Sequence, residues 1–105
     1  MAQWTVHRNP NPATRRDIPY LLDVQADLLA GLDTRIVIPL YARKAAPARL
    51  LARLTPELKI GAERVVLMTP QLAGIRVKDL GEPVGDLSAQ RASLLAALDL
   101  LLTGA

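Results

Sequence analysis

Residues 34–40 of the chain, TRIVIPL, are rich in β-branched side chains and almost continuously apolar. A strand covered on both faces has this pattern, whereas a half-exposed strand alternates between apolar and polar residues. We therefore expect this segment to be the central strand of a sheet. Because proline cannot donate a hydrogen bond to a neighbouring strand, Pro39 is expected at a bulge or at the strand end.

Shorter strands are predicted on either side of this segment. Residues 3–7 and 20–25 alternate between apolar and polar side chains and are expected to form a hairpin, joined by a Pro-rich loop. Residues 57–60 and 63–68 flank Gly61 and predict a second hairpin. A further short strand is expected at residues 75–78, before a turn at residues 81–83.

Two connections are predicted to be irregular. Residues 42–54 are helix-prone, but Pro47 limits any helix there to a short piece. Residues 26–33 hold Leu28, Leu29 and Leu32 around a glycine and are expected to form a loop that exposes apolar surface.

From residue 87 onward the hydrophobic period changes from two to about 3.6, which predicts a C-terminal helix. Ser88 is the expected N-cap, and Gly104 suits the C-terminal end. Leu100 falls outside the apolar stripe, where it is either a contact with another chain or an ordinary exposed leucine. The stripe itself consists of Leu94, Leu95, Leu98, Leu101 and Leu102.

The composition favours one domain over residues 1–105, and the hydrophobic content of 50% favours a homo-oligomer. A run of about 18 apolar residues and a signal-peptide pattern are both missing, so we expect a cytoplasmic protein with no membrane span. With no cysteine, disulfides and thiolate chemistry are excluded. A net charge of +3 is a weak signal for nucleic acid, because the basic residues are scattered and aromatics are few.

The sequence offers no evident catalytic constellation. His7 is the one histidine, and we expect it at the surface, with no partner residues for a zinc site. Phosphate-binding motifs are missing too, so no metal or cofactor is expected. Asp23 beside Gln25 could be a catalytic carboxylate, but a polar strand face or a hydrogen bond that fixes a neighbouring loop is the simpler interpretation. These residues favour binding over catalysis.

Several segments, taken together, resemble the CcdB family of bacterial toxins. They are residues 22–29 (LDVQADLL), 37–40 (VIPL), 60–61, 68–69, 81–88 (GEPVGDLS) and the helix ending in Gly104. The resemblance implies a mainly β (α+β) fold, a small antiparallel SH3-like barrel with a long C-terminal helix, that forms a homodimer.

The resemblance also implies a function. The family's toxins bind the A subunit of DNA gyrase, a topoisomerase, and trap it on cleaved DNA; a CcdA-like antitoxin peptide neutralises them. DNA would be involved only through gyrase or antitoxin complexes, and the protein would not be an enzyme.

The target-binding positions of the family correspond to Leu28, Leu29, Asp99, Thr103, Gly104 and Ala105. Trp4 is a further candidate, either as a core anchor of the first strand or as a contact near the helix tip. This chain departs from the family pattern at two of these positions. Thr103 replaces an aromatic residue, and Asp99 replaces an amide.

Two other functions remain open. The chain could be an endoribonuclease, because the related MazF-type toxins share the barrel. It could also be a non-toxic homologue that binds the antitoxin and has lost gyrase binding.

Overall fold

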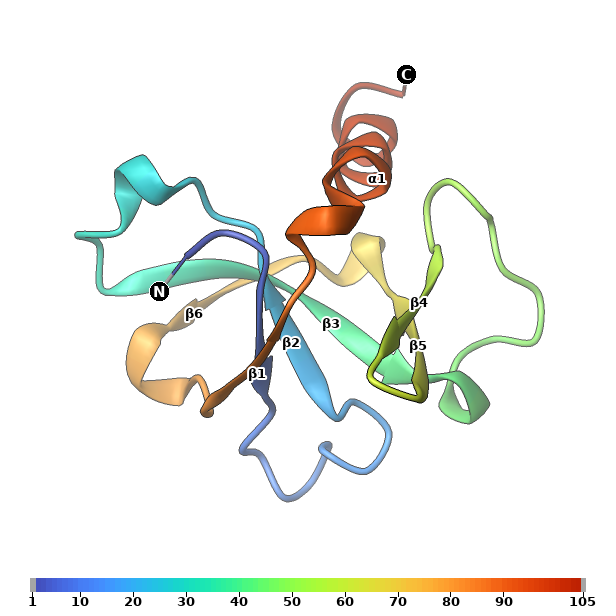
Figure 1. Ribbon diagram of the computed structural model, residues 1–105, viewed down its shortest axis with the longest axis horizontal. Coiled ribbons are helices and arrows are strands. Elements are labelled where there is room, and N and C mark those ends of the chain that lie inside the picture. Colours follow the sequence, from blue (N-terminus) through green and yellow to red (C-terminus); the bar gives the residue numbers. More distant parts are fainter. Residues whose placement is uncertain (1, 105) are drawn as a thin grey trace.

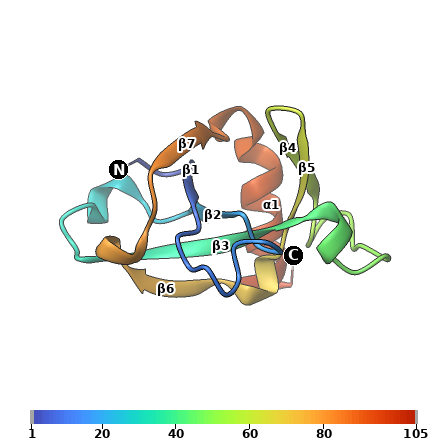
Figure 2. The same ribbon diagram turned by 90° about the horizontal axis from the view of Figure 1, so that it is seen from below.

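The computed structural model describes residues 2–104. Its central strand is β3 (Thr34–Ala42), as predicted (Figures 1 and 2). Strand β2 (Tyr20–Asp23) pairs along one edge of β3, while β5 (Glu63–Leu67) and β6 (Ala73–Arg76) share the other edge. Val37 and Ile38 point to opposite faces of β3 and are both buried, so the strand is covered on both sides.

Pro39 lies inside β3, which corrects the expectation of a bulge or strand end. Its carbonyl accepts a hydrogen bond from the Met68 amide at 3.0 Å, on the edge that faces away from β2. The N–H and C=O groups of one strand residue point to the same edge, so the missing donor falls there too. Along this edge the partner strand changes at Pro39 from β6, which lies opposite residues 34–37, to β5, which lies opposite residues 40–42. The missing N–H therefore falls between the two pairings, and the sheet tolerates the proline.

All pairings are antiparallel, in the order β4 (Glu57–Ile60), β5, β3, β2, β1 (Thr5–Arg8) and β7 (Pro83–Asp86), with β6 also beside β3. Strands β4 and β7 are the two ends of this order, and the sheet curls into a half-barrel (Figure 2). The expected combination of an antiparallel β fold and a C-terminal helix is confirmed.

The two predicted hairpins, β1–β2 and β4–β5, are present, but four strand assignments need correction. Strands β1 and β2 are shorter than expected, and β6 ends earlier because residues 77–79 form a 3-10 turn. Strand β7 was missed, since Pro83 and Gly85 are unfavourable in strands; β7 lies at the sheet edge, where a proline is tolerated. Residues 43–56 are irregular apart from one 3-10 turn at Arg43–Ala45, as expected.

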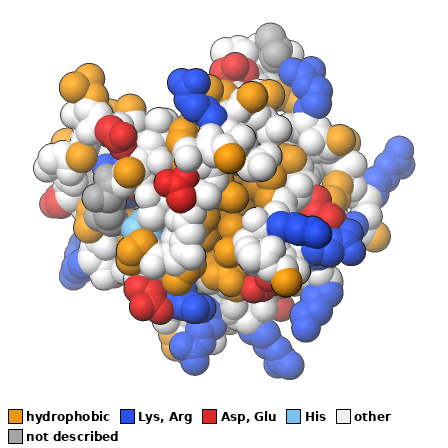
Figure 3. Space-filling model, in the orientation of Figure 1, with side chains coloured by type: hydrophobic (Ala, Val, Ile, Leu, Met, Phe, Trp, Pro, Cys, Tyr) orange, Lys and Arg blue, Asp and Glu red, His pale blue; other side chains and the backbone are white. Residues whose placement is uncertain are grey.

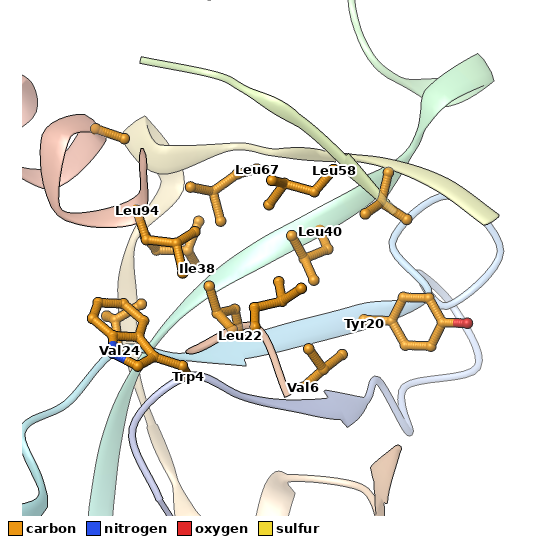
Figure 4. Packing of buried hydrophobic residues seen from close by; sticks show 13 residues of the cluster. Trp4, Val6, Tyr20, Leu22, Val24, Ile38, Leu40, Leu58, Leu67 and Leu94 are labelled. Carbon is orange, nitrogen blue, oxygen red and sulfur yellow. The ribbon is translucent and has the colours of Figure 1, made fainter. Parts of the chain in front are cut away.

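The hydrophobic core lies between the inner face of the curled sheet and the helix α1 (Arg91–Thr103) (Figure 4). Leu94 projects from the helix toward Ile38 of β3, and both side chains are fully buried. Within residues 2–104 no helix has the length and apolar character needed to cross a membrane.

The start of the helix differs from the prediction. Ser88 opens a 3-10 turn, Ser88–Gln90, and is not the N-cap of α1. Instead, the Asp86 carboxylate accepts a hydrogen bond from the Ser88 amide at 2.7 Å. Hydrogen bonding to Ser88 lowers the pKa of Asp86.

The buried face of α1 is also rotated from the predicted stripe. Ala97 is buried together with Leu94, so the face that meets the sheet is turned away from Leu102. Leu102, which was predicted in the apolar stripe, is therefore 71% exposed. Leu100, which was predicted outside the stripe, is half-buried. Gly104 ends the helix in the left-handed conformation, as predicted.

We expect Leu94→Ala to lower the free energy of unfolding by about 2–5 kcal/mol, because it leaves a cavity under α1. The matched variant Leu102→Ala removes an exposed side chain and should change the stability by less than about 0.5 kcal/mol. Urea denaturation of both variants checks this difference. Equal losses would show that α1 does not pack as described.

The Asp86 bond should make stability depend on pH. A carboxyl whose pKa is lowered by folding stabilises the fold above its unfolded pKa, and this stabilisation is lost as the pH falls through the lowered value. The difference in melting temperature between the wild type and Asp86→Ala should therefore be largest near neutral pH. This difference in melting temperature should disappear at pH values below the ordinary pKa range of an aspartate. A difference that grows as the pH falls would contradict the role of the Asp86 hydrogen bond.

Candidate functional site

Three leucines are exposed in the connection between β2 and β3. Leu28 is 94% exposed, Leu29 47% and Leu32 51%. All three lie in residues 26–33, here called the apolar loop, which contains the 3-10 turn η1 (Asp27–Leu29). The predicted loop with an exposed apolar surface is confirmed. A cluster of large exposed apolar side chains is typical of an interaction site.

Local hydrogen bonds give the apolar loop a defined shape. The amide of Leu29 donates to the carbonyl of Ala26 at 3.0 Å, which closes the η1 turn. The N-terminal segment also supports this turn, because the Gln3 amide donates to Oδ1 of Asp27 at 2.7 Å. The apolar side chains are therefore presented on an ordered turn.

A buried ion pair lies at the base of the apolar loop. Asp23 ends β2 and Arg35 is the second residue of β3; their side chains are 0% and 1% exposed. Nε and Nη2 of Arg35 both lie 2.7 Å from Oδ2 of Asp23. The other oxygen, Oδ1, accepts from the amide of Gln25 at 3.0 Å. The interpretation of Asp23 as a residue that fixes a neighbouring loop is confirmed.

Arg35 was not predicted to take part in this arrangement. The signal that could have found it is a charged residue inside an otherwise apolar strand. A buried charge is tolerated only with a partner of opposite sign, and Asp23 is a carboxylate on the strand predicted to precede it.

The second group of predicted positions lies at the C-terminal end of α1. Asp99, Thr103 and Gly104 are exposed there, next to the exposed Leu102. Gly104 has a φ of 76°, and its amide donates to the carbonyl of Leu100 at 3.1 Å. Ala105, the remaining predicted contact, lies outside the described residues.

The structure places these two groups apart. Figures 1 and 2 show the apolar loop and the C-terminal end of α1 at separate places on the molecule. Leu28 and Leu29 lie together in the first, and Asp99, Thr103 and Gly104 in the second. A partner that touches both must extend over much of the surface, as a macromolecule does.

Trp4 is a core residue and does not lie on this surface. Its side chain is 4% exposed and lies beside Val24 (Figure 4). Its backbone has a φ of 73°, which is unusual for a bulky residue and explains why β1 begins only at Thr5. Two hydrogen bonds hold this conformation, from the Trp4 amide to the Asp23 carbonyl at 2.7 Å and from the Leu87 amide to the Trp4 carbonyl at 2.9 Å. The interpretation as a core anchor is confirmed.

His7 is buried, with 1% exposure, so the expectation of a surface histidine is wrong. The reason is the close approach of the segment around Gly81, where a Cβ atom would lie 2.4 Å from the carbonyl oxygen of Arg8. Nδ1 of His7 lies 3.1 Å from the carbonyl oxygen of Gly81. A substrate cannot reach this ring without opening the fold.

The described part of the chain, residues 2–104, contains no group of three or more His, Cys, Asp or Glu residues that could hold a metal ion. At the surface, the predicted positions form two separate groups, one on the apolar loop and one at the C-terminal end of α1.

A family model described as "CcdB protein" matches residues 3–104 of this 105-residue chain. The match includes both the apolar loop and the described end of α1.

The buried ion pair between Asp23 and Arg35 should be needed for the stability of the fold. Arg35→Met leaves the carboxylate of Asp23 buried without its partner and should lower the free energy of unfolding by about 3–5 kcal/mol. The double variant Asp23→Asn/Arg35→Met removes the unpaired charge but keeps an acceptor for the Gln25 amide. It should recover most of the loss in chemical denaturation, and a double variant no more stable than Arg35→Met would contradict the pairing.

Proposed function

Because this chain belongs to the CcdB family, we propose that it is a toxin that binds the A subunit of DNA gyrase through the apolar loop and the end of α1. The family consists of toxins of toxin–antitoxin systems, which act as binding inhibitors. The observation that carries the proposal is the exposure of Leu28, Leu29 and Leu32 on an ordered loop fixed to a buried ion pair.

The apolar loop supplies the main source of binding energy in this proposal. Covering an exposed leucine contributes roughly 1.5–3 kcal/mol, and Leu28 is almost fully exposed in the free protein. Because the loop is already ordered, little conformational entropy is lost when a partner covers it.

The end of α1 supplies the second contact. Thr103 stands where the family pattern has an aromatic residue, and the exposed Leu102 beside it provides apolar surface. Asp99 adds an exposed carboxylate one helical turn before Thr103, whose hydroxyl donates to the Asp99 carbonyl at 2.7 Å. A basic group on the target would suit this end.

The burial of the catalytic candidates supports binding over a ribonuclease activity. A ribonuclease needs an acid–base group within hydrogen-bonding reach of its substrate. His7 is enclosed by the segment around Gly81, and Asp23 is paired with Arg35 below the surface.

We also propose a homodimer and an antitoxin partner, in the cytoplasm. Half-buried leucines along α1, namely Leu95, Leu98, Leu100 and Leu101, would be covered further by a second copy.

Figure 3 shows hydrophobic side chains in the middle of one face, with Lys and Arg side chains mainly around its lower and right rim. A CcdA-like antitoxin with an acidic, partly disordered segment would suit this face, and DNA would be involved only through gyrase or the antitoxin complex.

One observation favours a second candidate function. An aromatic residue at an interface often carries a large share of the binding energy. Thr103 in its place favours a homologue that binds the antitoxin but has lost gyrase binding.

The test is binding of the purified protein to the A subunit of its own host's gyrase, together with a DNA supercoiling assay. We expect binding, and Leu28→Asp should weaken it at least about tenfold, because it places a charge in an apolar contact. The control is Leu51→Asp, which alters a leucine that is 61% exposed in another loop and should leave affinity unchanged.

A wild-type protein that does not bind the target would contradict the gyrase proposal. If that protein still binds a CcdA-like peptide, the second candidate function holds.

A further inference from the structure

We infer that Gln25 is a positioning residue, whose buried side-chain amide ties the apolar loop to β3 and so sets the orientation in which Leu28 and Leu29 meet their partner. This inference rests on the proposed function, because it takes the apolar loop as the contact surface. Gln25 lies between the end of β2 and the η1 turn and is 7% exposed.

The side chain of Gln25 makes two hydrogen bonds to two different elements. Its Oε1 accepts from the amide of Ile36 in β3 at 3.1 Å, and its Nε2 donates to the carbonyl of Leu29 at 3.0 Å. A neutral amide offers both an acceptor and a donor, as this bridge requires. The last residue of η1 is thereby linked directly to the central strand.

The backbone of Gln25 is itself fixed by the buried ion pair. Its amide donates to Oδ1 of Asp23 at 3.0 Å, and its carbonyl oxygen lies 3.4 Å from Nη2 of Arg35. Gln25 therefore connects the ion pair, β3 and the apolar loop.

The turn bonds inside η1 cannot replace this connection. The bond from the Leu29 amide to the Ala26 carbonyl closes the turn, but it lies within the loop and does not orient it relative to the sheet. The bond from Gln3 to Asp27 reaches the start of the turn, whereas Gln25 reaches its end. Losing the Gln25 bridge should therefore loosen the end of the turn and leave the apolar loop free to change its orientation.

The test uses Gln25→Met, which keeps the length of the side chain and removes both hydrogen bonds. The matched control is Gln90→Met, at an exposed residue near the start of α1. We expect Gln25→Met to weaken binding to the gyrase target by on the order of tenfold and Gln90→Met to leave it unchanged.

A double-mutant cycle separates positioning from general stability. In the Leu28→Ala/Leu29→Ala background, Gln25→Met should cost less than about twofold in affinity, because the side chains that it positions are already gone. Full additivity of the two losses would overturn the inference, since it would show that Gln25 acts independently of the loop.

Amide hydrogen exchange of the free protein gives a readout that does not depend on the target. In Gln25→Met the amides of Leu29 and Ala30 should exchange faster by on the order of tenfold, while those of the β1–β2 ladder stay unchanged. Unchanged exchange in the loop would overturn the inference. If the wild type does not bind gyrase, the proposed function fails, and the exchange result still decides the role of Gln25.

If Gln25→Met fails to fold, Gln25→Glu is the second variant. It keeps an acceptor for the Ile36 amide and loses the donor to the Leu29 carbonyl when its carboxyl is ionised. The same changes in affinity and loop exchange are expected from it.

Discussion

The ion pair between Asp23 and Arg35 holds together β2, β3 and the base of the apolar loop. Both side chains are buried, so the pair holds the end of β2 and the start of β3 together where the sheet gives way to the apolar loop. The carbonyl of Asp23 also accepts from Trp4, and the carbonyl of Trp4 accepts from Leu87, just before the helical segment begins. A continuous set of hydrogen bonds therefore runs from the loop to the start of the C-terminal helical region.

Much of the fold could be predicted because hydrophobic periodicity reports local structure. The apolar run at residues 34–40 identified the central strand, and the change of period after residue 87 identified the helix. Strand β7 could not be found in the same way. Its pairing with β1 joins residues about 80 positions apart in sequence, and its composition is that of a turn. The rotation of α1 depends on how the helix meets the sheet, which its own sequence does not specify.

The two parts of the candidate site, the apolar loop and the end of α1, differ in how far the residues alone predicted them. The apolar loop follows from the residues themselves, since three leucines gather around a glycine between two strands. The end of α1 was identified by family resemblance alone. The burial of His7 and the pairing of Arg35 escaped prediction because both depend on residues brought close by the fold, Gly81 in one case and Asp23 in the other.

We propose that the ordered apolar loop and the end of α1 together form a surface for a macromolecular partner. The most direct measurement is hydrogen–deuterium exchange of this protein with and without its proposed gyrase target. Slower exchange in residues 26–33 and at the C-terminal end of α1, with the β4–β5 hairpin unchanged, is the predicted result. Protection confined to other elements, or none at all, would contradict it.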